Sequence, residues 1–205
     1  MKRAVILLIL ILCLSVVSYA EQPEIRFDFE KGTDEWGIPD WAMGQEDMVG
    51  KSSGVSSAEA STGEHSLELV SDFPGNTWAA SLVELDREID LVGYKTISFD
   101  VFLPSDVKND LMQARIVVTA GPWFYIEMRE PVRLKKGKWT TVSARLDPGA
   151  RKELAEWKCN TNEECLGEHL NSVKKITLRI EYDANNSQAG SPYDGPVYID
   201  NIVIK

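Results

Sequence analysis

Short runs of alternating apolar and polar residues recur along the chain, separated by clusters of Gly, Pro, Asn and Asp. In the clearest run, Thr96–Leu103, every second residue from Ile97 is apolar, and Pro104 ends the run. This spacing is typical of strands with one buried face. Only residues 150–158 have helical composition, which disfavours a parallel α/β architecture. The pattern predicts an all-β fold, an antiparallel β-sandwich of the jelly-roll type, with a closed barrel as the alternative.

The first 20 residues have the features of a secretory signal peptide. Two basic residues precede an uninterrupted apolar run at residues 4–14, and Ser-Tyr-Ala at residues 18–20 forms a cleavage site. The apolar run is shorter than a membrane-spanning helix requires. We therefore expect a secreted or periplasmic protein with a single domain over residues 21–205 and no membrane attachment after cleavage.

Charge and cysteine content narrow the range of partners. The leader contains two of the 22 Lys and Arg residues, so 20 remain against 32 Asp and Glu, a formal charge of −12. Such a chain repels nucleic acid and anionic membranes, and we expect a monomer. Cys159 and Cys165 remain after cleavage, and an even pair in an exported protein predicts a disulfide. A zinc site with His169 as a third ligand is the alternative.

One predicted strand, Trp123–Arg129, has an unusual polar face. Its even-numbered residues are apolar and predicted to be core, whereas Trp123, Tyr125, Glu127 and Arg129 share the other face. Two aromatic rings in line with a carboxylate and a guanidinium form a flat wall that can both stack and hydrogen-bond. Such a wall suits a sugar, whose apolar ring face lies against aromatic side chains. An ordinary solvent-facing strand with cross-strand pairs is the alternative.

Other predicted strands add similar residues to this face. If the central strands pair in one sheet, the further outward side chains are Asp100, Phe102, Arg115, Thr119, Arg179 and Glu181. Lys is absent from this set and Arg recurs, as expected where planar groups recognise a ligand through paired hydrogen bonds. Trp41, in a long irregular segment, is a secondary candidate for a sugar contact. The composition favours a ligand cleft over a merely solvated sheet.

Five short motifs follow one another along the chain. They are Phe27-Asp28-Phe29-Glu30, Ala60–Leu67, Ile97–Val101, Lys138–Val142 and Val197–Ile202. In order and spacing they resemble galactose-binding-like carbohydrate-binding modules, of the kind appended to bacterial β-glucanases and β-mannanases. The resemblance covers nearly all of residues 21–205 and implies a jelly roll that binds a β-glucan or β-mannan on one sheet. It also implies a separate glycoside hydrolase that works alongside the protein.

The resemblance assigns roles to individual residues. It implies that Trp78, Trp123 and Tyr125 stack on sugar rings. Tyr182 resembles another stacking tyrosine, although alternation from Ile176 places it on the core face unless the strand bulges. The residues for which the resemblance implies polar contacts with the glycan are Arg115, Glu127, Arg129, Arg179 and Glu181, and Asp100 is a further candidate by its outward position.

A structural calcium site is also implied by the resemblance. Its ligands would be the side chains of Glu30 and Asp200, with Asp28 and backbone carbonyls of residues 62–66 completing the shell. The chemistry is suitable, because Ca²⁺ prefers oxygen ligands from carboxylates and carbonyls. The alternative is that Asp28 and Glu30 are ordinary polar residues of a strand.

The sequence favours a binder over an enzyme. Glu127 and Glu181 could in principle act as the carboxylate pair of a glycoside hydrolase, but neighbouring arginines favour the ionised form of both acids and leave neither as a proton donor. A jelly-roll polysaccharide lyase that uses Arg with Tyr or His is the stronger enzymatic alternative, and His65 and His169 are the only histidines. A hydrolase accessory subunit and a non-glycan assembly or adhesion domain are further alternatives. We predict a non-catalytic, secreted polysaccharide-binding module.

Overall fold

The computed structural model describes residues 22–108, 110–146, 156–159, 166–182 and 190–205. The predicted signal peptide therefore lies outside the described residues, so its cleavage stays a prediction. Within the described part of the chain, twelve strands and three short helical turns are present, and none of the helices is long and apolar enough to cross a membrane.

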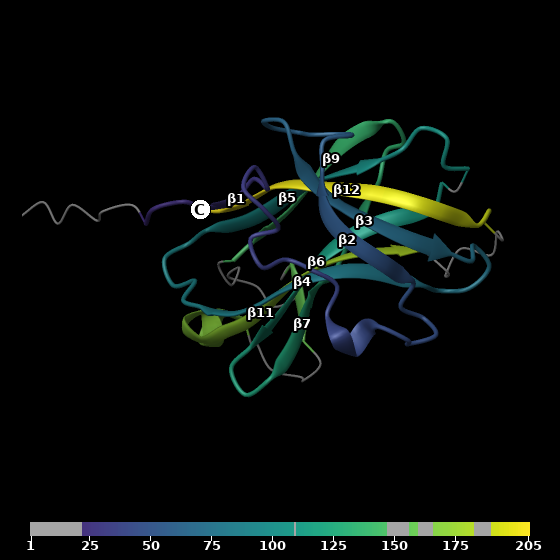
Figure 1. Cartoon of the computed structure of the whole chain (residues 1–205). Coiled ribbons are helices and arrows are strands. Elements are labelled where there is room, and N and C mark those ends of the chain that lie inside the picture. Colours follow the sequence, from purple (N-terminus) through teal and green to yellow (C-terminus); the bar gives the residue numbers. More distant parts are fainter. Residues whose placement is uncertain (1–21, 109, 147–155, 160–165, 183–189) are drawn as a thin grey trace, which may run out of the picture.

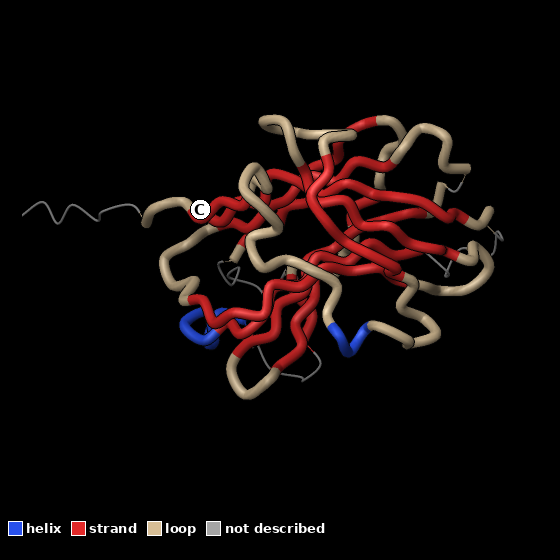
Figure 2. The backbone as a smooth tube through the Cα atoms, in the orientation of Figure 1, coloured by secondary structure: helices blue, strands red, loops and turns tan. Residues whose placement is uncertain are grey.

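Two antiparallel sheets lie one over the other (Figures 1 and 2). The first sheet has the order β2 (Gly50–Ser56), β3 (Ser66–Phe73), β12 (Tyr193–Ile204), β5 (Thr96–Leu103) and β9 (Lys138–Arg145), with β1 (Ile25–Phe27) paired to β12. The second sheet has the order β10 (Trp157–Cys159), β7 (Phe124–Met128), β6 (Met112–Ala120), β11 (Val173–Tyr182) and β4 (Ala80–Ile89), with β8 (Val132–Arg133) paired to β6. The predicted antiparallel β-sandwich of the jelly-roll type is confirmed.

Helical structure is confined to short turns. These are η1 (Asp40–Ala42), α1 (Leu166–His169) and η3 (Leu170–Ser172). The turn η1 belongs to the long segment between β1 and β2, and this segment runs beside the second sheet (Figure 2). Isolated bridges from Gly37 to Glu84 and from Met48 to Ala80 hold it against β4. The edge of the second sheet is thereby partly covered.

The core fills the space between the sheets. Phe99 and Val101 of β5 are fully buried from one side, and Ile116, Ile126 and Leu178 are fully buried from the other. Each of these residues alternates along its strand with a side chain on the outer face, as the sequence pattern predicted. Because side chains alternate in this way, a row of polar and aromatic side chains lies on the outer face of the second sheet.

One local prediction is corrected by the structure. The helix predicted over residues 150–158 is wrong at its end, because Trp157 and Lys158 belong to β10 and pair with Met128 and Glu127; residues 150–155 lie outside the described part. The buried Trp157 ring donates a hydrogen bond from Nε1 to the Arg145 carbonyl oxygen at 2.6 Å. Tertiary packing therefore outweighs helix propensity at this point.

Candidate functional site

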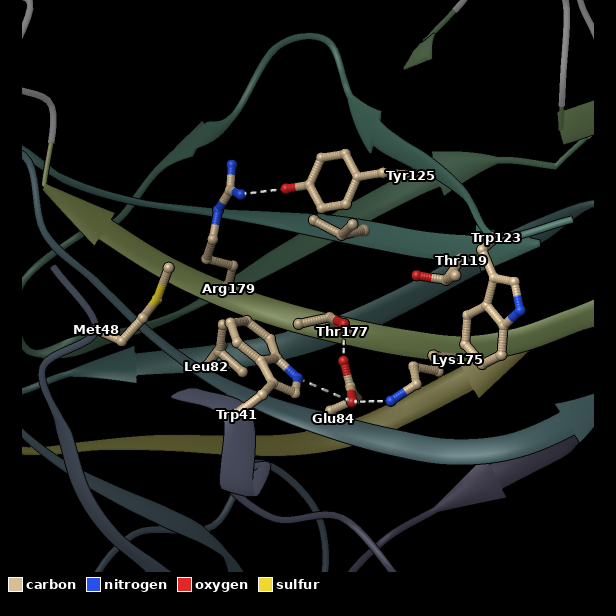
Figure 3. A pocket seen from close by; sticks show the side chains of 11 residues that line it. Trp41, Met48, Leu82, Glu84, Thr119, Trp123, Tyr125, Lys175, Thr177 and Arg179 are labelled. Atoms are coloured by element: carbon tan, nitrogen blue, oxygen red, sulfur yellow. Dashed lines mark hydrogen bonds and ion pairs between the residues drawn. The ribbon is translucent and has the colours of Figure 1, made fainter. Parts of the chain in front are cut away.

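A cavity of about 450 Å³ opens on the outer face of the second sheet, and we call it the cleft (Figure 3). Its floor is formed by buried side chains of three adjacent strands, Leu82 of β4, Thr177 of β11 and Val117 of β6. These positions alternate with core residues, so they necessarily point away from the sandwich interior. Trp41 and Trp123 flank this floor.

The two indoles reach the cleft from irregular segments. Trp41 lies in η1 and is 48% exposed, and Trp123 lies in the turn between β6 and β7 and is 62% exposed. Exposed Trp side chains that face one hollow are unusual for a surface that meets only water. The Trp41 Nε1 atom lies 3.4 Å from Glu84 Oε1, a long hydrogen bond that orients the ring toward the cleft (Figure 3).

Trp123 departs from the predicted strand. The strand β7 begins at Phe124, and Trp123 has a φ of 72°, a left-handed conformation that L side chains rarely adopt. Gly121 in the same turn has a φ of 57°, and a β-carbon there would lie 2.7 Å from the His169 ring. Turn geometry, and not strand alternation, therefore places the Trp123 indole at the cleft. Strained backbone of this kind is often found at functional sites.

A polar network forms one wall of the cleft. Arg179 of β11 donates a short hydrogen bond from Nη1 to the Tyr125 hydroxyl and another from Nη2 to Glu127 Oε2 at 2.8 Å. Burial raises the pKa of the Tyr125 phenol above its ordinary value of 10.0. Burial alone would lower the pKa of Arg179, but the neighbouring Tyr125, Glu181 and Glu127 together raise it. The wall thus consists of a neutral phenol and a permanently charged guanidinium.

The buried base of this network is Glu181. Its side chain is 2% exposed and accepts hydrogen bonds on Oε1 from Arg115 Nε at 2.9 Å and from Gln113 Nε2 at 2.9 Å. Its other oxygen lies 2.9 Å from Arg179 Nε, an ion pair whose angle is not that of a hydrogen bond. Arg115 also donates to the Met128 carbonyl oxygen. The acid therefore fixes both arginines and has no exposed face of its own.

Glu84 is a further buried acid on the cleft floor, and the sequence prediction did not include it. It is 7% exposed and accepts hydrogen bonds from Lys175 Nζ at 2.8 Å and from Thr177 Oγ1 at 3.0 Å. Hydrogen bonds with Asp86 and Glu84 raise the pKa of Lys175, although burial opposes the shift most strongly. The sequence did contain a signal for the two partners of Glu84. Lys175 and Thr177 alternate with the core residues Ile176 and Leu178, so both side chains are expected on the outer face of the sheet.

The structure brings most of the predicted glycan contacts together. Arg115, Tyr125, Glu127, Arg179 and Glu181 form the network, and the Trp78 ring centre lies 6.0 Å from the Arg179 guanidinium carbon. Trp41 and Thr119 line the cleft as well. The exposed Arg129 follows the end of β7, and its backbone N–H donates to the Glu156 carbonyl oxygen next to β10.

Three residues predicted as candidates for the glycan face lie elsewhere in the structure. Asp100 and Phe102 do point outward, but from the first sheet, because β5 pairs with β12 and β9 and not with β6. Asp100 there accepts hydrogen bonds from Ser61 and Thr141. Tyr182 is 2% exposed and belongs to the core, where its hydroxyl accepts a hydrogen bond from Gly190. None of the three residues faces the cleft.

The predicted calcium ligands are engaged by hydrogen-bond donors. Glu30 Oε1 accepts hydrogen bonds from two backbone N–H groups of the turn before β3, at Glu64 and His65. Asp200 is fully buried and accepts from the N–H groups of Ser61 and Thr62 in the same turn. Among the described residues, no group of three or more metal-ligating side chains lies close enough to hold a metal. In this arrangement the acids do not form one oxygen cage, so calcium binding stays a proposal.

Only one of the two cysteines of the predicted disulfide lies in the described part of the chain. Cys159 ends β10 and is half-buried, whereas Cys165 lies outside the described residues. The disulfide therefore stays a prediction. His169, the alternative zinc ligand, packs against Phe124 with a ring-centre distance of 5.2 Å.

Taken together, the cleft combines two kinds of contact. Trp41 and Trp123 present aromatic surface, and the Arg179 and Glu84 clusters present hydrogen-bonding groups held in place by neighbouring strands. Such a site can bind a ligand that is apolar on one face and rich in hydroxyl groups at its edges.

Comparison with known proteins identifies the fold. No protein-family model and no curated protein sequence matches the chain. A structure from work on the promiscuous specificity of carbohydrate-binding modules of the β-sandwich superfamily is similar with a TM-score of 0.57 and 15% identity, covering 87% of this chain and 60% of that one. This chain therefore spans less than two thirds of that protein's length.

Two further structures extend the comparison. A family 11 carbohydrate-binding module from Clostridium thermocellum, in complex with a β-1,3-1,4-mixed-linked tetrasaccharide, has a TM-score of 0.52 and 14% identity over 88% of this chain and 94% of that one. A family 27 module described in terms of specific mannan recognition has a TM-score of 0.50 and 16% identity over 89% and 98%. The predicted resemblance to β-sandwich carbohydrate-binding modules is thereby confirmed at the level of the fold.

Proposed function

We propose that this protein is a secreted or periplasmic, non-catalytic module that binds a polysaccharide of the β-glucan or β-mannan type in the cleft. It would act as a monomer alongside a separate glycoside hydrolase. The observation that carries the proposal is the pair of exposed indoles, Trp41 and Trp123, which line one hollow together with the Tyr125–Arg179 pair. A pyranose ring can stack on such indoles while its hydroxyls meet the polar wall.

The polar wall is already ordered before a ligand binds, which reduces the entropy lost on binding. Arg179 is held by Glu127 and by the buried Glu181, so its guanidinium loses little freedom when a ligand arrives. Similar proteins named for recognition of mannan and for a mixed-linked glucan tetrasaccharide share this fold. At the identities found, the shared fold supports the proposal without assigning the ligand.

A polysaccharide lyase is the second candidate, because Tyr125 and Arg179 are hydrogen-bonded partners inside the cleft. A lyase base must accept a proton from the sugar, which for Tyr requires the phenolate. Burial raises the pKa of Tyr125, so the phenol stays protonated at neutral pH. The described residues that line the cleft include no histidine that could replace it. These features favour a binder.

Affinity electrophoresis of the purified protein tests the proposal. Gels that contain mixed-linkage β-glucan, β-1,4-mannan or xylan should retard the protein in at least one case, and incubation should release neither reducing sugar nor an unsaturated, ultraviolet-absorbing product. Migration that is unchanged in all three gels would overturn the binding proposal. Product release that is lost in Tyr125→Phe would favour the lyase.

A further inference from the structure

A second cavity of about 340 Å³ adjoins the cleft on the side of Trp41. Trp41, Glu84 and Lys175 line both cavities, so the two form one continuous groove along β4. The second cavity is otherwise bounded by Glu35, by residues 37–40 and by Asp86. We call this part the acidic end of the cleft.

The acidic end carries an excess of negative charge. Its charged lining consists of Glu35, Asp40, Glu84, Asp86 and Lys175. Lys175 Nζ lies 2.8 Å from carboxylate oxygens of both Glu84 and Asp86, so one ammonium group is shared between two acids. Glu35 is paired with Arg87 at 3.2 Å, and Asp40 has no ion pair within the part of the chain that the structure describes. Four carboxylates less these two cations leave a net charge of −2.

The other end of the cleft offers an anion no compensating partner. Arg179 is the cation on that side, and it is already engaged by Tyr125, Glu127 and Glu181. The Lys174 ammonium group lies 5.4 Å from the centre of the Trp123 ring, but Lys174 is not among the residues that line the cleft. A ligand carboxylate would therefore meet protein carboxylates at one end of the cleft. At the other end it would meet a guanidinium that is already paired with two carboxylates.

We infer that the cleft selects uncharged glycans and rejects those built from uronic acids, with Asp40 and Asp86 as the residues that determine this selectivity. This inference rests on the proposed function. Sugar hydroxyl groups can donate hydrogen bonds to Asp40 and Asp86, whereas a uronate would place a like charge beside them. Repulsion is strongest where a groove limits the access of water and counter-ions, and added salt screens it.

Matched polysaccharides separate charge from shape. The probes are mixed-linkage β-glucan and β-1,4-mannan, their C6-oxidised polyuronate forms, and the methyl esters of those oxidised forms. In about 0.01 M salt, where screening is weak, the oxidised form of the bound glycan should bind about tenfold more weakly than its neutral parent. The methyl ester should restore binding, and about 1 M salt should narrow the gap.

Two double variants locate the effect. Asp40→Asn with Asp86→Asn should narrow the gap between the neutral and the oxidised glycan about threefold or more at low salt, whatever its effect on the neutral glycan alone. Asp72→Asn with Asp106→Asn changes the net charge equally but lies away from the cleft, on the first sheet and in the segment that follows β5, so it should preserve the gap. Equal binding of neutral and oxidised glycans by the unmodified protein would overturn the inference, as would an equal effect of both double variants. Failure to bind any neutral glycan would instead overturn the proposed function.

Discussion

Glu181→Ala should be among the most destabilising single substitutions on the outer face of the second sheet. The carboxylate is 2% exposed and accepts hydrogen bonds from Arg115 at 2.9 and 2.5 Å and from Gln113 at 2.9 Å, with Arg179 2.9 Å away. Its removal leaves two partly buried guanidinium groups with Glu127 as their remaining shared acid, so one positive charge of the network loses its partner. Breaking a buried ion pair in this way costs about 3 to 5 kcal/mol, a large part of a total stability of about 5 to 15 kcal/mol.

Urea denaturation followed by far-ultraviolet circular dichroism measures this effect. With an m-value of about 2 kcal/mol per M, the unfolding midpoint should fall by about 1.5 to 2.5 M. The control is Asp72→Ala, because Asp72 pairs with Lys51 at 3.2 Å with both side chains about half exposed; exposed pairs contribute only about 0 to 1 kcal/mol. A midpoint for Glu181→Ala within the range of the control would refute the argument that this acid organises the network.

Three further predictions concern the core, acid stability and calcium. Ile126→Ala removes a fully buried side chain and should cost about 2 to 5 kcal/mol in urea, whereas Tyr125→Phe next to it should leave the midpoint nearly unchanged; equal losses would contradict the register of β7. Backbone hydrogen bonds from Glu64 and His65 lower the pKa of Glu30 below 4.5, so the carboxylate stabilises the fold above pH 4.5 and this stabilisation is lost as the pH falls further. Glu30→Gln should therefore flatten the fall in Tm below pH 4.5. The same dependence of Tm on pH in the variant and the unmodified protein would exclude a role of Glu30 in acid stability. To bind calcium, the turn at residues 61–65 must present carbonyl oxygens in place of the N–H groups that now donate to Asp200. If it does, calcium at 100 times its Kd should raise the free energy of unfolding by about 2.7 kcal/mol. A Tm that neither calcium nor a chelator changes would leave the hydrogen-bonded arrangement of Asp200 as the native one.

Most of the fold could be predicted from the sequence because alternation is a local signal. Residues 96–103 form β5 with the predicted bounds, and β7 differs from its prediction by one residue at each end. Alternation also placed Tyr182 in the core, and the structure confirms that placement. The family resemblance instead implies a ligand contact for Tyr182, but this buried side chain is not among the residues that line the cleft.

The site could be predicted only in part because alternation gives the face of a strand and not its sheet. Asp100 points outward as expected, but β5 lies in the first sheet, so the residue is remote from the cleft. Glu84 gains its role from pairing between β4 and β11, which brings Lys175 and Thr177 beside it. Trp41 reaches the cleft through an irregular segment whose path follows from bridges to β4. These features depend on contacts between distant parts of the chain.

Isothermal titration of the protein with mixed-linkage β-glucan and β-1,4-mannan oligosaccharides directly measures whether the cleft binds a neutral glycan. We expect one binding site per chain for at least one of these neutral ligands. Trp41→Ala and Trp123→Ala should each weaken binding by about 1 to 3 kcal/mol through loss of stacking area, with Tm nearly unchanged because both rings are about half exposed or more. Absence of binding to every neutral oligosaccharide, or full affinity in both tryptophan variants, would contradict glycan binding in the cleft.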